Sequence, residues 1–191
     1  MAVLPIITIG HPLLRQVARQ VERAELASAA VQSFIDDLIL TMRQAHGAGL
    51  AAIQVAEPVQ ICVIEVCNNA RYPYKPNVPL TVLVNPKLTA LTAEEFENYE
   101  GCLSVPNLRG RVKRFAEIHV SALDRFGNAI ETDIRGLTAG TYQHEVDHLN
   151  GILFVDRVFD PRTLTTLENF SAYEIERFAA EAKALVARFG A

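Results

Sequence analysis

The segment HEVDH at residues 144–148 restricts what this chain can be more than any other stretch. In a helix, His144 and His148 are separated by one turn plus about 40°, so both imidazoles leave the same face. The two imidazoles can share one cation, and Glu145 then lies beside that cation without being a ligand. This pattern is typical of metal hydrolases, but it leaves a tetrahedral site without its third protein ligand.

Length and charge narrow the class of protein. A chain of 191 residues is long enough for one domain with a sizeable core and short for two, so we expect a single domain over residues 1–191. A formal net charge of -4 argues against nucleic-acid binding. The sequence opens without a signal segment, and no apolar run approaches the ~20 residues of a membrane span. We therefore expect a cytoplasmic protein that binds neither membranes nor specific nucleic-acid sequences.

The chain has three cysteines, an odd number, and their spacing is not that of a disulfide framework. This indicates a reducing compartment, where a functional cysteine acts as a thiolate. Cys62 lies in an apolar strand pattern and is expected to be a buried, inert thiol, and Cys67 has no evident role. Cys102 has polar neighbours, Glu100 and Ser104, that are unusual for core filling. A thiolate at position 102 would complete a Cys-His-His set with one open position, as in catalytic metal sites.

Apolar periodicity predicts the main elements. An amphipathic helix is expected over about 28–45, ending where Gly47 can adopt the left-handed conformation, and the helix with the two histidines should run from Gly136 to Asn150-Gly151. The chain after Pro161 is expected to be helical to about residue 189. Strands are expected at about 59–66, 81–84, 110–115, 117–124 and 129–135, with a break at Asn85-Pro86 and an exposed loop over 68–79.

Two stretches have both a structural and a functional interpretation. The small residues from Gly47 to Gln54 either allow close packing or let backbone groups approach a ligand, with Gln54 as a neutral donor. The basic run at Arg109, Arg111, Lys113 and Arg114 is either a solvated strand face or an anion site. The residues alone leave both choices open.

Three segments together resemble the peptide deformylases of the bacterial type. Residues 47–54 (GAGLAAIQ) are similar to the family motif GxGxAAxQ, residues 100–104 (EGCLS) to its second motif, and residues 144–148 to its third, HExDH. The resemblance extends over about residues 3–160. It implies an α+β fold in which antiparallel sheets pack around a central metal-binding HExDH helix, with an N-terminal amphipathic helix and a C-terminal helix over about 161–189.

The resemblance also implies a reaction: removal of the N-terminal formyl group from formylmethionyl peptides of newly made proteins, releasing formate. Cys102, His144 and His148 would hold the metal, whose bound hydroxide attacks the formyl carbon, with Glu145 as general base and then acid. The side-chain amide of Gln54 and the backbone N–H of Leu103 would stabilise the developing oxyanion.

Further residues would bind the substrate, which is expected to dock as an added extended strand. They are Gly47, Gly49, Gly101, Arg109, Gly140 and Thr141. Gly140 and Thr141 depart from the bulkier apolar or basic residues that many family members have near the methionine side-chain pocket. We therefore expect a pocket that is wider or rearranged at these two positions.

The cofactor implied is one divalent metal per chain. Motif spacing does not distinguish iron, zinc, nickel and cobalt, whereas the resemblance favours Fe(II). The expected partners are formylated nascent peptides, and transient contact with the ribosome stays open.

Two other functions are compatible with part of the pattern. A zincin-type endopeptidase takes a third ligand downstream of its helix, but no histidine follows His148, and Asp156, Asp160 and Glu168 are the remaining candidates. A non-catalytic binding protein of the same fold would be expected to lose Glu145 or a metal ligand, and all of these residues are present.

Overall fold

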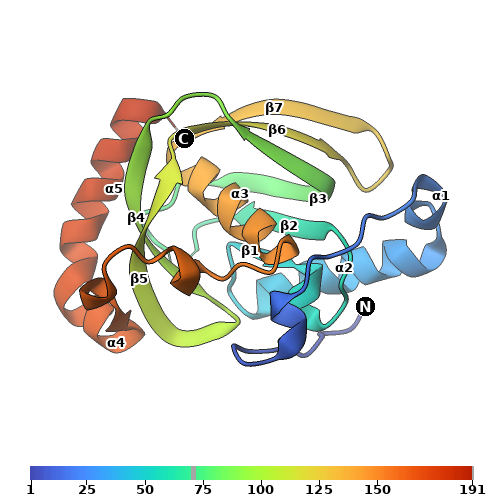
Figure 1. The fold of residues 1–191 in the computed structure, drawn as a ribbon, viewed down its shortest axis with the longest axis horizontal. Helices are drawn as coiled ribbons and strands as arrows, with labels where there is room; N and C mark the ends of the chain where they lie inside the picture. The colour runs from blue at the N-terminus through green and yellow to red at the C-terminus, as the bar shows by residue number, and fades with distance from the viewer. Residues whose placement is uncertain (70–71, 191) are drawn as a thin grey trace.

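Two antiparallel sheets lie on either side of a central helix, α3 (Gly136–Leu149), in the computed structural model of the chain (Figure 1). The structure describes residues 1–69 and 72–190. One sheet has the strand order β1-β2-β3-β6-β7 and the other the order β4-β5-β8. The strands are β1 (Gly49–Ala51), β2 (Ile61–Val66), β3 (Val78–Ala90), β4 (Glu95–Cys102), β5 (Val105–Phe115), β6 (Glu117–Leu123), β7 (Ala129–Arg135) and β8 (Thr165–Thr166). The predicted α+β fold is confirmed.

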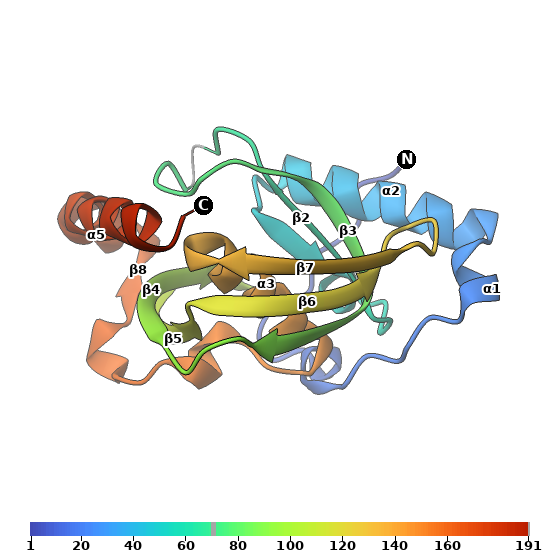
Figure 2. The same ribbon diagram turned by 90° about the horizontal axis from the view of Figure 1, so that it is seen from above.

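The five-stranded sheet is covered on both faces, by α3 on one side and by α2 (Ala29–Gln44) on the other (Figure 2). Successive residues of a strand point to opposite faces. Cys62 and Ile64 of β2 therefore pack with residues of α3, while Ile61 and Val63 pack with residues of α2. Cys62 is fully buried, as predicted, and burial raises the pKa of its thiol.

Helix α2 begins as predicted, with the Ser28 hydroxyl accepting a hydrogen bond of 3.3 Å from the Val31 N–H. Its end differs from the prediction, because His46 and not Gly47 has the left-handed backbone, with φ of 52°. Glycine is needed at position 47 for space. A Cβ atom there would lie 3.0 Å from both the Gly49 carbonyl oxygen and a Leu103 methyl group.

The prediction of a helix over about 161–189 is wrong at its start. Thr165–Thr166 form strand β8, which pairs with β5 at Leu108 and Arg109. The helical region begins only with α4 (Leu167–Asn169) and continues through a π-helical turn (Phe170–Glu174) into α5 (Ile175–Phe189). Helix α5 lies along β4 and β5 at one side of the molecule (Figure 1). The sequence analysis also missed β4, which is acidic rather than apolar at its start.

Two other predictions are corrected between β2 and β3. Strand β3 does not break at Asn85-Pro86, because a shift of register between Val84 and Lys87 takes up the irregularity. The segment 68–79 is not simply an exposed loop, since Tyr72 is 6% exposed. Residues 70–71 of that segment lie outside the described part of the chain.

The remaining elements are short. They are the helix α1 (Arg23–Leu26) and four 3-10 turns, Pro12–Arg15, Ala52–Val55, Phe154–Arg157 and Pro161–Thr163. The N-terminal segment forms no strand, but the Ile7 and Ile9 N–H groups donate to the Gln54 and Ser104 carbonyl oxygens at 2.9 and 2.7 Å. Within the described residues, no helix is long and apolar enough to cross a membrane.

Candidate metal centre and active site

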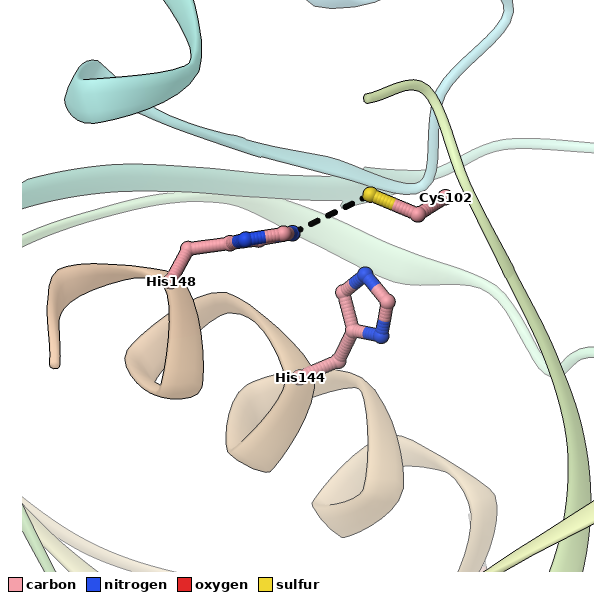
Figure 3. Close-up of side chains that lie close together, drawn as sticks. All are labelled: Cys102, His144 and His148. Carbon is pink, nitrogen blue, oxygen red and sulfur yellow. Dashed lines mark hydrogen bonds between the residues drawn. The ribbon is translucent and has the colours of Figure 1, made fainter. Parts of the chain in front are cut away.

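Helix α3 presents His144 and His148 on one face, as their spacing predicts. The helix begins at Gly136, whose φ of 55° turns the chain from β7 into α3. The two rings lie edge to face with centroids 4.9 Å apart. Both point toward the end of β4 (Figure 3).

Cys102 ends β4 and faces the two histidines (Figure 3). One ligand atom from each of Cys102, His144 and His148 lies within 4.8 Å of the others, and the Cys102 Sγ is 3.2 Å from the His148 Nε2. A thiolate and two imidazole nitrogens suit a divalent transition metal and leave one coordination position open. The residues present therefore fit one cation, and the sequence prediction that these three side chains meet is confirmed.

The charges of the site favour an ionised thiol. Burial acts to raise the pKa of Cys102, but the imidazoles of His148 and His144 outweigh burial and hold that pKa well below its ordinary value. For His144 the directions are reversed. Burial acts to lower the pKa of its imidazole, but hydrogen bonds to Cys102 and Glu100 raise that pKa well above the ordinary value. The thiolate that a metal requires is thus stabilised by its surroundings.

A buried network of charged residues orients His144. The Glu100 carboxylate accepts from the His144 Nδ1 at 2.8 Å, which leaves the Nε2 directed at the site. Arg114 donates twice to Glu100 at 2.8 Å and once to Asp147 at 2.6 Å. Arg157 donates to the same aspartate at 2.5 Å. The sequence analysis assigned no role to this network, because its members are far apart in the chain.

Of the four basic residues on β5, only Lys113 is exposed to solvent. Arg109 and Arg114 are 1% and 2% exposed. The Arg114 guanidinium is paired as described above, and the Arg109 guanidinium lies between the rings of Tyr72 and Phe170, 4.9 and 4.8 Å from their centroids. Arg109 is buried behind Gly101 and is not among the residues that line the cavity at the metal site. Its predicted contact with substrate stays a prediction.

Glu145 lies in the same cavity as the three candidate ligands. It is 4% exposed, and burial raises the pKa of its carboxyl. Its Oε2 has no hydrogen-bond partner among the described residues. A Cβ atom at position 49 would overlap the Glu145 carboxylate, so the glycine in strand β1 makes room for this side chain.

Gln54 approaches the metal site from the 3-10 turn after β1. Its Oε1 accepts from the Ala51 N–H at 2.8 Å, and its Nε2 is thereby directed to the Ser104 hydroxyl at 3.0 Å and the Cys102 Sγ at 3.5 Å. Leu103 lines the same cavity. The structure brings both predicted oxyanion residues to the candidate ligands.

The other predicted substrate residues also meet at this cavity. Those that line it are Gly47, Gly49, Gly101, Gly140 and Thr141. Gly140 and Thr141 both have close neighbours. A Cβ atom at position 140 would lie 3.2 Å from the Phe96 ring, and the Thr141 hydroxyl accepts a hydrogen bond from Lys75. The sequence analysis missed Lys75 and Tyr72, which reach the cavity from the segment expected to be an exposed loop.

Comparisons with known proteins agree with this geometry. The family model described as polypeptide deformylase matches residues 3–163. The chain belongs to the polypeptide deformylase family. The deformylase assignment made from the motifs is confirmed, and with it a metal-dependent hydrolase.

Individual relatives of this deformylase are similar over most of their length. Peptide deformylase 2 of Nostoc is 42% identical over 167 residues, covering 87% of this chain and 92% of that protein. The crystal structure of a class I type b peptide deformylase from Acinetobacter baumannii with Met-Ala-Ser bound is 39% identical, with a TM-score of 0.79 over 82% of this chain and 99% of that one. A Synechococcus elongatus peptide deformylase in complex with actinonin is 34% identical, with a TM-score of 0.75 over 95% of this chain and 90% of that one.

Proposed function

We propose that this deformylase hydrolyses the formyl amide of peptides that begin with formylmethionine, forming formate and a free N-terminal amine. The observation that supports this most directly is the meeting of Cys102, His144 and His148 in one cavity with the buried Glu145. The Acinetobacter relative, which binds the tripeptide Met-Ala-Ser, supports a peptide with an N-terminal methionine as product.

One divalent cation would be held by Cys102, His144 and His148. When bound, it would supply Lewis-acid chemistry, which lowers the pKa of water enough to make it a nucleophile near neutral pH. Among iron, zinc, nickel and cobalt we propose Fe(II), on the family resemblance.

Glu145 would move the proton. Its carboxylate takes a proton from the attacking water and passes it to the amine that leaves when the C–N bond breaks. A carboxyl with a raised pKa is suited to both steps, because it can hold the proton between them.

Gln54 and Leu103 would stabilise the negative charge on the formyl oxygen. The hydrogen bond from the Ala51 N–H fixes the Gln54 amide, so its NH₂ group is directed at the site before substrate arrives. A donor of this kind contributes on the order of 3 kcal/mol in comparable sites.

Strand β1 offers a place for the substrate backbone, because it is the edge strand of its sheet and Gly47 and Gly49 border the cavity. An extended peptide would pair there and be read through its main chain, with Gly101, Gly140 and Thr141 around it. Formylated nascent chains in the cytoplasm would be the substrates, met during transient contact with the ribosome. Residues 1–191 would act as one catalytic domain.

The endopeptidase alternative loses support, since two of its three candidate ligands are engaged elsewhere and the third, Glu168, is exposed and does not belong to the group formed by His144 and His148. Asp156 pairs with Arg15 and accepts from the Leu153 N–H, and Asp160 pairs with Arg162. A non-catalytic binding role gains no support, because the motif residues all lie in place at the cavity.

The decisive assay incubates metal-replete protein with formyl-Met-Ala-Ser and measures formate. We expect formate release, and none from a Cys102→Ala variant. Protein with its full metal content that released no formate would refute the proposal, and internal cleavage of a longer peptide would favour the endopeptidase.

Metal identity needs a separate experiment. Protein purified without oxygen is analysed for its metal and then reconstituted with iron, zinc, nickel or cobalt. We expect the iron form to have the highest kcat/KM, and a zinc form that surpassed it would overturn the choice of Fe(II).

A further inference from the structure

Arg157 lies outside the three sequence motifs and forms a bidentate ion pair with Asp147 of α3. It ends the 3-10 turn Phe154–Arg157 that follows the helix, and its Nε and Nη2 donate to the two carboxylate oxygens of Asp147, both at 2.5 Å. The Arg157 side chain is 41% exposed, whereas Asp147 is buried. The pair therefore connects the surface of the molecule with the interior of the helix layer.

The Asp147 carboxylate begins a chain of charge-assisted hydrogen bonds that ends at a candidate metal ligand. Its Oδ2 also accepts from the Arg114 Nη1 at 2.6 Å. The Arg114 Nε and Nη2 donate to the two oxygens of Glu100, both at 2.8 Å, and the Glu100 Oε2 accepts from the His144 Nδ1 at 2.8 Å. Positive and negative groups alternate from Arg157 to Glu100, so every buried charge in the chain is paired.

Arg157 is the member of this chain that fixes the plane of the Asp147 carboxylate. Arg114 contacts only the Oδ2 of Asp147, through one nitrogen, and Arg157 is the only donor to its Oδ1 among the described residues. A carboxylate held through one oxygen can rotate about its Cβ–Cγ bond. Two parallel hydrogen bonds from a planar guanidinium prevent that rotation.

Loss of Arg157 would change the position of Arg114. The Asp147 carboxylate would then have Arg114 as its only ionic partner, and a buried carboxylate with one partner either draws that partner closer or turns toward solvent. Arg114 can move only by weakening its two hydrogen bonds to Glu100, which keep that carboxylate on the His144 Nδ1. The His144 Nε2 belongs to the same rigid ring and would move with it.

We propose that Arg157 is a positioning residue, which keeps the His144 imidazole in the orientation that binds the divalent cation. It acts through Asp147, Arg114 and Glu100 and is not among the residues that line the active-site cavity. The inference rests on the proposed metal-dependent function and adds to it a residue that no motif contains. In metal sites generally, the hydrogen-bonding partners of a ligating histidine set its orientation and affect metal affinity.

Titration of the Co(II)-substituted protein with a chelator tests this, because both the affinity for Co(II) and its visible absorption bands depend on ligand geometry. We expect Arg157→Met to weaken Co(II) binding about tenfold, the lower end of the effect of such partners, and to shift the absorption bands. Arg157→Lys keeps the positive charge but lacks the bidentate fork, so its affinity should be intermediate.

The matched control is Arg15→Met. Arg15 also forms a bidentate ion pair with a carboxylate of the same turn, Asp156, but within the described part of the chain that pair has no hydrogen bond to Asp147, Arg114 or Glu100. The variant removes the same charge and should leave the Co(II) affinity and the absorption bands unchanged.

An unchanged Co(II) affinity in Arg157→Met overturns the inference. An equal loss in Arg15→Met, or full recovery in Arg157→Lys, also overturns it, because either result would assign the effect to charge and not to position. If Arg157→Met does not fold, Arg157→Lys is compared with Arg15→Lys, and equal affinities overturn the inference. These measurements involve no substrate, so absence of formate from formyl-Met-Ala-Ser with the unaltered enzyme would refute the proposed function separately.

Discussion

Glu145 illustrates how single residues prepare this site for chemistry. The carboxyl group is buried against the backbone of Gly49 and has an oxygen without a hydrogen-bond partner among the described residues. Its charged form is disfavoured by burial, while the nearby imidazoles of His144 and His148 act in the opposite direction. Such a group can both take up and release a proton during one reaction.

Replacing Glu145 by glutamine should remove activity and preserve the metal. We expect kcat to fall by about 10²–10⁴, because an amide cannot accept the proton from water. Formate release and metal content are measured on the same preparation, with Glu176→Gln on the exposed face of α5 as control. Retention of near-normal kcat by Glu145→Gln would remove this residue from the proposed mechanism.

Lys75 should make stability depend on pH in a defined window. Its folded pKa of about 8 lies below the ordinary value of 10.5, so between these values the unfolded chain holds a proton that the folded chain has lost. The free energy of unfolding should therefore rise with pH across this window, by about 3 kcal/mol relative to Lys75→Met. Urea denaturation of both proteins from pH 7 to pH 10.5 measures the difference, and parallel profiles would contradict the lowered pKa.

In strand β3, one residue preserves an element that was predicted to break at Asn85-Pro86. Asn85 has φ of 52°, and its side chain accepts from the Val21 N–H and donates to the Val21 carbonyl oxygen, both at 2.9 Å. Asparagine tolerates the left-handed conformation better than most residues. The strand therefore continues past Pro86 through a local shift of register.

Two substitutions at Asn85 separate its side-chain bonds from its backbone. Asn85→Gly loses two hydrogen bonds, about 2 kcal/mol of the free energy of unfolding. Asn85→Ala should lose about 1 kcal/mol more, since alanine is strained at positive φ. Urea denaturation of the three proteins gives the comparison. Equal stabilities for the glycine and alanine variants would show that the backbone conformation contributes nothing.

At the scale of the whole molecule, the C-terminal helix supports one wall of the active site. Phe178 of α5 is fully buried and packs edge to face on Tyr74 and on Tyr99, with centroid separations of 4.8 and 5.5 Å. Tyr99 lines the cavity, and Tyr74 is next to Lys75. Helix α5 therefore packs firmly on the catalytic part of the chain, a point that the sequence left open.

Truncating Phe178 should be costly for that reason. Phe178→Ala should lower the free energy of unfolding by about 3–5 kcal/mol, the usual effect of deleting a buried aromatic ring. Tyr173→Ala is the matched control in the preceding turn, because Tyr173 is 80% exposed. Denaturant unfolding of both variants measures the effect, and similar small losses would mean that α5 does not stabilise the molecule.

Features that depend on local pattern could be predicted from the amino-acid sequence alone. The apolar period of α2 predicts an amphipathic helix. The spacing of His144 and His148 and the polar surroundings of Cys102 predict metal ligands. Together with the motif order they predicted the fold class, the three candidate ligands and the family.

Features that depend on residues far apart in the chain became visible only in the folded molecule. Arg114 is buried because Glu100 and Asp147, 14 and 33 positions away, neutralise it, and a single strand pattern cannot reveal those partners. Lys75 lines the cavity, where its ammonium donates a hydrogen bond to the hydroxyl of Thr141, 66 positions away. Burying a charge is unfavourable unless the fold provides a partner, so the environment of each charged residue was settled by packing and not by local sequence.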